Sequence, residues 1–131
     1  MLRYLGFVGL GLALAAPVSA QTFRAENGVN VTPVAGGFAV ASGNGFWARG
    51  MWCAAADYAR DVLGAGGTQR LYVAQPQPRG SRTPVVFSLD PAGLTPSRVT
   101  ILGASIRTAG ANLSVDHAQG FCADHKLLSG R

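Results

Sequence analysis

The sequence has little charge and almost no lysine. Of its 131 residues, 13% are Asp, Glu, Lys or Arg, and 11 basic residues against 6 acidic ones give a formal net charge of +5. Lys126 is the only lysine, and the arginines are spread along the chain without a block of like charge. The basic and aromatic motifs of the common nucleic-acid binders are also missing. The composition therefore argues against a nucleic-acid partner.

One loose concentration of arginines remains among these scattered residues. Arg70, Arg79 and Arg82 lie in or beside the proline-containing segment 75–82. Scattered arginines mostly keep a surface soluble, but a guanidinium can also hold an oxyanion through two hydrogen bonds. We therefore treat these three as candidate anion-binding residues. Their partner would be an anionic envelope component, such as a lipid headgroup, an acidic glycan or phosphate, or another exported protein.

Long apolar runs are missing after the first twenty residues. Arg3 precedes an apolar run over 5–16, and Val18-Ser19-Ala20 offers the small-x-small pattern that signal peptidase cleaves. The run is shorter than the roughly 20 residues that span hydrocarbon. We predict a signal peptide over 1–20 that is cleaved between Ala20 and Gln21, and no transmembrane anchor after cleavage. The protein would then be exported to the periplasm or the extracellular space.

The remaining chain is short for more than one hydrophobic core. Removal of residues 1–20 leaves 111 residues, enough for one domain and too few for two. Residues 21–28 show little periodicity and are expected to form a flexible lead-in. The single globular domain would cover 29–131.

Cysteine is also scarce, with Cys53 and Cys122 as the only two. In an exported domain two thiols usually form one disulfide. Such a bond would close a loop of about 70 residues and contribute at most roughly 4 kcal/mol on the chain-entropy model. We predict a disulfide between Cys53 and Cys122.

Alternating apolar residues and turn signals indicate short strands around one main helix. Residues 29–40 predict a β-hairpin about Gly36-Gly37, and Pro33 places its first strand at a sheet edge. Further strands are expected over 71–74, 85–89 and 99–102, with 105–108 continuing the last or forming its own, before a turn at 110–112. These patterns predict an α+β fold with a single antiparallel sheet of about five strands.

The clearest helix is predicted over 46–63. Its apolar positions recur every three or four residues, and Gly64 ends it. A short C-terminal helix can follow, with Ser114 as its cap and Asp116 in its first turn. The sheet would pack against the central helix.

Four aromatic residues of the predicted helix are expected in the core: Phe46, Trp47, Trp52 and Tyr58. A tryptophan exposed beside Arg49, Arg70 or Tyr72 would instead indicate a groove for a ligand or partner.

Cys53 has a second interpretation, as a catalytic nucleophile. Residues 51–64 followed by 69–73 resemble the transglutaminase-like cysteine enzymes, which place the nucleophile on a helix that runs into a strand. The resemblance implies a cysteine-dependent acyl-transfer or hydrolytic enzyme that uses Cys53 and His117. The chain departs from that family because Asp116 precedes His117, whereas the family has the histidine before the acidic residue.

A metal site is the other chemistry that the C-terminal residues suggest. His117, Cys122 and His125 lie close in sequence, with Asp116 and Asp124 beside the histidines. A structural zinc site needs four ligands and would use the thiolate that the disulfide needs. We therefore expect neither a metal nor another cofactor.

The whole chain also resembles small exported bacterial proteins to which no activity is assigned. The likeness rests on Trp52-Cys53-Ala54-Ala55, Phe87-Ser88-Leu89 and Cys122-Ala123. It implies the same disulfide and no particular reaction. A binding or structural domain is thus the leading interpretation of the sequence, with the cysteine enzyme as the alternative.

Overall fold

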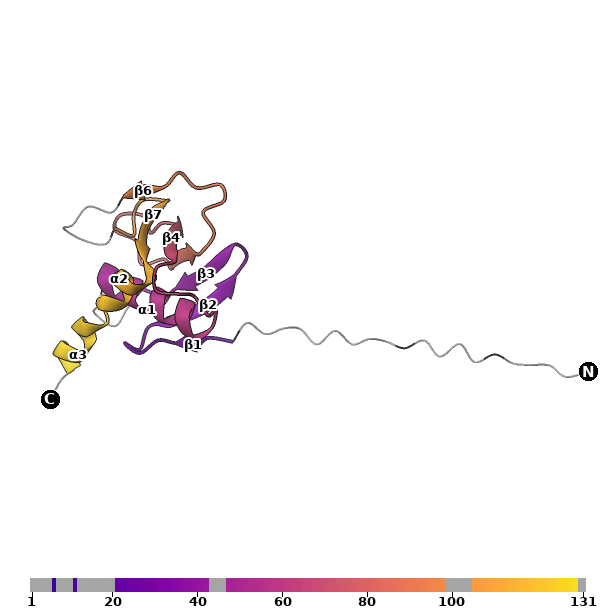
Figure 1. Cartoon of the computed structure of the whole chain (residues 1–131), viewed down its shortest axis with the longest axis horizontal. Helices are drawn as coiled ribbons and strands as arrows, with labels where there is room; N and C mark the ends of the chain where they lie inside the picture. The colour runs from indigo at the N-terminus through magenta and orange to yellow at the C-terminus, as the bar shows by residue number, and fades with distance from the viewer. Residues whose placement is uncertain (1–5, 7–10, 12–20, 43–46, 99–104, 130–131) are drawn as a thin grey trace, which may run out of the picture.

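A computed structural model describes residues 6, 11, 21–42, 47–98 and 105–129 of the chain. One sheet holds its strands in the order β1-β2-β3-β5-β4-β7-β6 (Figure 1). The strands are β1 Phe23–Arg24, β2 Asn30–Val34, β3 Gly37–Val40, β4 Arg70–Gln75, β5 Val85–Ser88, β6 Ser97–Arg98 and β7 Ala111–Ser114. The helices are α1 Trp47–Asp61, α2 Val115–Gly120 and α3 Ala123–Ser129. Among the described residues, no helix has the length and apolar character needed to cross a bilayer.

The N-terminal hairpin has the turn that the sequence predicts. β2 and β3 pair antiparallel with Val34 opposite Gly37, so two residues make the turn. Gly36 in that turn has a φ of +80°, which glycine adopts without steric cost. On its other side β2 pairs with β1 only at Asn30 and Val31, so Pro33 lies where the described sheet has no further strand. The missing N–H of Pro33 therefore costs no ladder hydrogen bond.

The core lies between α1 and one face of the sheet. Residues Met51 to Ala59 of α1 are buried, and the alanines let the helix lie close to the strands. Trp52 meets Phe87 with ring centroids 4.9 Å apart, and Phe38 meets Tyr58 at 4.7 Å. Strand residues that face the helix alternate with residues of the opposite face, as period-2 patterns require. Those of the helix face are Val31, Phe38, Val40, Leu71, Val73, Val85, Phe87 and Leu113.

The end of α1 follows the predicted chemistry. The helix stops at Asp61, and Gly64 has a φ of +66°. This left-handed residue turns the chain so that the Ala65 N–H donates to the Ala59 carbonyl at 2.9 Å. The predicted central helix and the single α+β sheet that packs against it are confirmed.

Two differences concern the strands of the second half. The segment 105–108 forms a bend rather than a strand, and residues 111–112 begin β7 rather than lie in a turn. The reversal sits one residue earlier, at Gly110, whose φ is +86°. β7 then pairs antiparallel with β4 and parallel with the two-residue β6. The sheet has seven strands where about five were expected, because β1, β6 and β7 are too short to show periodicity. The predicted strand over 99–102 lies outside the described residues.

Residues 21–28 are integrated into the fold, unlike the flexible lead-in expected from the sequence. Phe23 and Arg24 form β1, and Ala25 is buried against the core. Asn27 is buried as well, and its Nδ2 donates to the Gly50 carbonyl at 2.9 Å. Within this segment only Ala25 and Asn27 are buried, and two buried positions are too few to produce a recognisable alternation of apolar residues. The sequence therefore predicts no strand in this segment.

The last two helices form the C-terminal arm (residues 115–129), in which α2 lies beside α1 and α3 extends beyond it toward the C-terminus (Figure 1). Ser114 caps α2 as predicted, because its Oγ accepts the His117 N–H at 3.1 Å. Cys122 follows α2 and is bonded to Cys53 of α1, with Cα atoms 5.0 Å apart. The predicted disulfide and the short C-terminal helix are both confirmed.

Candidate functional site

A cavity of about 490 Å³ opens beside the amino end of α1. Its walls come from the loop 76–84 between β4 and β5, and from the segment 105–107 that precedes β7. We call it the arginine cavity. Its lining residues are Ser42, Trp47, Ala48, Met51, Gln77, Ser81, Arg82, Ser105, Ile106 and Arg107.

The apolar part of the lining lies on both sides of the opening. Met51 and Ile106 are buried, whereas Trp47 is 83% exposed. The expectation that Trp47 belongs to the core is therefore wrong. Trp47 is the first residue of α1 and lies outside the face that packs on the sheet. The expectation failed because the spacing of apolar residues does not distinguish the end of a helix from its middle.

The backbone of Trp47 is unusual too. Its φ is +50°, the only positive value among the described residues other than glycine. A bulky residue in the left-handed region is a genuine outlier, and such residues are concentrated at ligand sites. An exposed indole and an uncommon backbone conformation thus coincide at the edge of the cavity.

The two loops that form the walls are joined by hydrogen bonds. The Gln77 N–H donates to the Ile106 carbonyl at 2.8 Å, which ties one wall to the other. The side-chain amide of Gln77 donates to the Thr83 carbonyl at 2.8 Å. Ser81 Oγ accepts the Thr83 N–H, and Ser105 Oγ accepts the Arg107 N–H. Most polar side chains of the lining therefore hold the loops in shape.

The guanidinium groups of the lining are the exception. Within residues 21–42, 47–98 and 105–129, neither Arg82 nor Arg107 makes a side-chain hydrogen bond or ion pair. None of the described residues that line the cavity is Asp or Glu, and the first turn of α1 carries no acidic residue. The amino end of a helix adds partial positive charge from its free N–H groups. The cavity therefore concentrates positive charge that no described carboxylate neutralises.

The three arginines expected from the sequence to bind anions are separated in the fold. Arg82 lines the cavity and Arg79 is exposed in the same loop without lining it. Arg70 lies on β4, where its Nε and Nη2 donate to Asn112 Oδ1 at 3.0 and 2.7 Å. Arg107 lines the same cavity as Arg82, although the two are 25 positions apart in sequence, and both are exposed. No local signal singles out Arg107, because its partner in the site comes from another loop.

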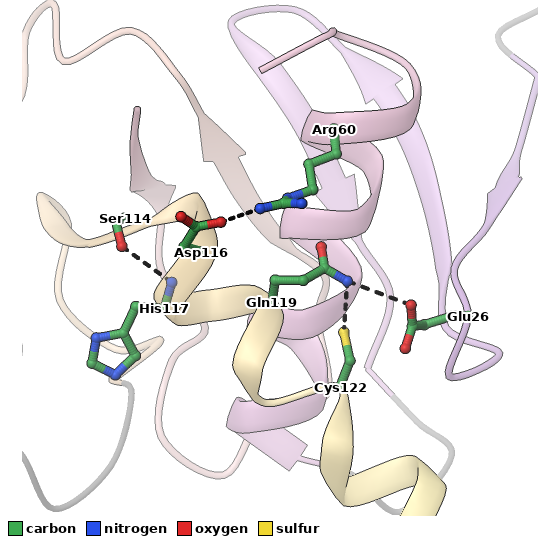
Figure 2. A network of polar contacts seen from close by, with 7 residues as sticks. All are labelled: Glu26, Arg60, Ser114, Asp116, His117, Gln119 and Cys122. Atoms are coloured by element: carbon green, nitrogen blue, oxygen red, sulfur yellow. Dashed lines mark hydrogen bonds and ion pairs between the residues drawn. The ribbon is translucent and has the colours of Figure 1, made fainter. Parts of the chain in front are cut away.

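The disulfide lies away from this cavity, within a polar network of the C-terminal arm. Gln119 Nε2 lies 3.4 Å from both Glu26 Oε2 and Cys122 Sγ (Figure 2). Cys53 is fully buried, and its sulfur is bonded to Cys122. His117 is exposed, and its ring points away from Cys122 in Figure 2. The oxidised structure therefore contains no free thiol beside His117.

The two aspartates and the cysteine considered as metal ligands have other partners. Asp116 forms an ion pair with Arg60, and Asp124 pairs with Arg49 at 2.9 Å. Among the described residues, the one group with metal-like spacing holds Glu26, Cys53 and Cys122 within 4.8 Å. Because its two sulfurs are bonded to each other, this group offers no thiolate to an ion.

Asp57 is the one acidic side chain that is buried among the described residues. Its Oδ2 accepts the Glu26 N–H at 2.7 Å. Burial raises the pKa of Asp57 above its ordinary value of 3.8, the Glu26 N–H opposes the rise, and nearby Asp61 and Glu26 add to it. This carboxyl anchors the segment 21–28 to α1 and does not reach the cavity lining.

Comparison with known proteins places this chain in no family. No protein-family model matches it, and neither the curated proteins nor the solved structures contain a match. The geometry of the cavity is therefore the basis for a functional proposal.

Proposed function

We propose that this protein is an exported binding domain and that the arginine cavity binds an anionic ligand. Export rests on the leader pattern over 1–20, and a disulfide is compatible with an oxidising compartment. The disulfide holds the C-terminal arm on α1 and leaves the opposite side of that helix to form the cavity. In this proposal the disulfide is structural and the cavity is functional.

The observation that carries the proposal is a pair of arginines without a counter-charge. Arg82 and Arg107 line one cavity, and its described lining holds no carboxylate. Both residues are exposed, so solvent and salt screen their charges, but no described carboxylate compensates them. A bound anion supplies that compensation and accepts charge-assisted hydrogen bonds from the two guanidiniums.

Other features of the cavity suit ligand binding. Its volume of about 490 Å³ falls within the range of small-molecule sites. The bond from Gln77 to Ile106 holds the walls together before any ligand arrives. A preformed site loses less conformational entropy on binding.

The cysteine-enzyme alternative lacks a comparable observation. It requires a thiolate at Cys53, whereas that sulfur is bonded to Cys122 in the structure. It also requires a histidine directed at the sulfur, and the ring of His117 points away from Cys122 (Figure 2). We therefore favour binding over catalysis.

The test compares two double variants of equal charge change. Arg82→Gln with Arg107→Gln alters the cavity, and Arg24→Gln with Arg79→Gln alters two exposed arginines outside its lining. Calorimetric titrations would use acetate, inorganic phosphate, 3-phenylpropionate and vesicles with anionic lipid. We expect at least one probe to bind, with affinity at least tenfold lower in the cavity variant and within twofold of the parent in the control. Absence of binding, or equal losses in both variants, would overturn the proposal.

A further inference from the structure

We infer that the ligand of the arginine cavity is a small aromatic acid, with its carboxylate between the arginines and its ring against Trp47. This inference rests on the proposed function and specifies the ligand class of the same site. It follows from the distribution of polar and apolar groups around the cavity.

The first step concerns which groups are free to bind. Ser81, Ser105 and Gln77 are engaged in holding the two loops. Within the described residues, Arg82 and Arg107 have no such engagement, so they are the donors available to a ligand. Because a guanidinium presents parallel N–H groups, it matches the two oxygens of a carboxylate.

The second step concerns the rest of the ligand. A bare inorganic anion would leave the apolar lining of Ala48, Met51 and Ile106 unused. That lining and a volume of about 490 Å³ suit an organic body attached to the acid. Met51 can adapt to the shape of that body, because its side chain is flexible and polarisable. The ligand should therefore be amphiphilic.

The third step selects a flat ring over a chain. Trp47 is 83% exposed at the cavity edge. Its backbone is in the left-handed region, which only glycines adopt elsewhere in the described chain. An indole offers a broad apolar face, on which an aromatic ring stacks or meets edge to face with a gain beyond simple area burial. We expect this gain to appear as a threefold to tenfold preference for an aromatic ring over a saturated one.

The test uses four probes that differ in one feature each. With the disulfide-bonded protein, calorimetry would compare 3-phenylpropionate with acetate, with the neutral 3-phenylpropanamide and with 3-cyclohexylpropionate. We expect the aromatic acid to bind at least tenfold more tightly than acetate or the amide, and threefold to tenfold more tightly than the cyclohexyl acid. The variant Trp47→Ala should lose the preference for the aromatic ring, and Trp47→Phe should retain most of it.

The outcomes separate this inference from the proposed function. If acetate, phosphate or anionic vesicles bind as tightly as 3-phenylpropionate and still require Arg82 and Arg107, the aromatic assignment fails while anion binding stands. Equal affinity for the cyclohexyl acid would likewise overturn the role of Trp47. If no probe depends on the two arginines, the proposed function fails as well.

Discussion

The arginines on the two sides of α1 differ in whether they have an acidic partner. On the side that carries the C-terminal arm, Arg49 pairs with Asp124 and Arg60 pairs with Asp116. On the cavity side, Arg82 and Arg107 belong to a lining in which no described residue carries a carboxylate. Charges of a surface that serves only the fold can be satisfied within the chain. Among the described residues, the arginines on the arm side are paired within the chain, whereas the two arginines of the cavity have no ion pair.

The contacts of the arm extend this contrast beyond the ion pairs. The Arg49 guanidinium lies 4.9 Å from the centre of the Phe121 ring, a cation–π distance. Lys126 lies 3.9 Å from Glu26, and the disulfide joins the arm covalently to α1. The arm thus has several independent attachments, whereas the exposed Trp47 at the cavity has no ring partner among the described aromatic pairs.

The largest effect should come from the covalent attachment of the arm. The double variant Cys53→Ala with Cys122→Ala should lower the free energy of unfolding by about 2–4 kcal/mol, because the unfolded chain regains the freedom of a long loop. Urea unfolding followed by circular dichroism would measure the change.

Ligand binding provides the complementary measurement on this variant. Where it remains folded, its affinity for the cavity probe should stay within twofold of the parent, since neither cysteine lines the cavity. Reduced parent protein is the control for loss of the bond without substitution. An unchanged unfolding midpoint would show that the arm is held by its other contacts alone.

A second prediction concerns Asp57, a buried carboxyl without an ion pair among the described residues. Because the folded state raises the pKa of Asp57 above 3.8, it holds this proton more tightly than the unfolded chain does. Protonation of Asp57 makes its largest contribution to the free energy of unfolding below pH 3.8, and this contribution is lost as the pH rises through the raised pKa. Relative to Asp57→Asn, the parent should therefore become less stable between pH 4 and pH 7.

Unfolding of both proteins across this pH range would test the sign. Asp90→Asn is a matched control, because exposed Asp90 also accepts one backbone N–H, from Ala92 at 2.9 Å. The prediction would be contradicted if the parent became more stable relative to Asp57→Asn as the pH rises. It would mean that the Glu26 N–H outweighs burial.

The smallest effect should distinguish a paired arginine from an unpaired one. Arg60→Gln removes an exposed ion pair and should cost about 0.2–1 kcal/mol, reduced by added salt. Arg107→Gln should leave the free energy of unfolding within about 0.5 kcal/mol of the parent, because its exposed side chain makes no hydrogen bond or ion pair among the described residues. Thermal unfolding at two salt concentrations would compare them. If Arg60→Gln and Arg107→Gln destabilised the protein equally, the distinction between paired and unpaired arginines on the two sides of α1 would not hold.

The elements with strong local patterns were predictable from the sequence. Each of these features depends on residues that are near one another in the sequence: the hairpin about Gly36, the helix that ends before Gly64, and the Ser114 cap. The strands β1, β6 and β7 were not predicted, because two to four residues carry too little periodicity to exceed chance. Their existence depends on pairing with strands that are distant in the sequence.

The candidate site was less predictable than the fold. Of three arginines singled out by proximity in the sequence, one lines the cavity, and its neighbour there is Arg107. Trp47 fits the apolar period of α1 and was assigned to the core, but its position at the first turn leaves it exposed. A site assembled from two loops and a helix end has no contiguous motif.

By itself, the sequence determined the composition of the parts: one central helix, short strands with glycine turns, and two cysteines available for one bond. Local backbone preferences and hydrophobic periodicity suffice for these features because they act between near neighbours. Only the tertiary structure decided that Asp116 and Asp124 pair with Arg60 and Arg49, and that Arg82 and Arg107 line one cavity with no acid among its described residues. Which charges lie side by side depends on how the sheet and the loops bring distant segments together, and the interaction of charges is set by that distance in space.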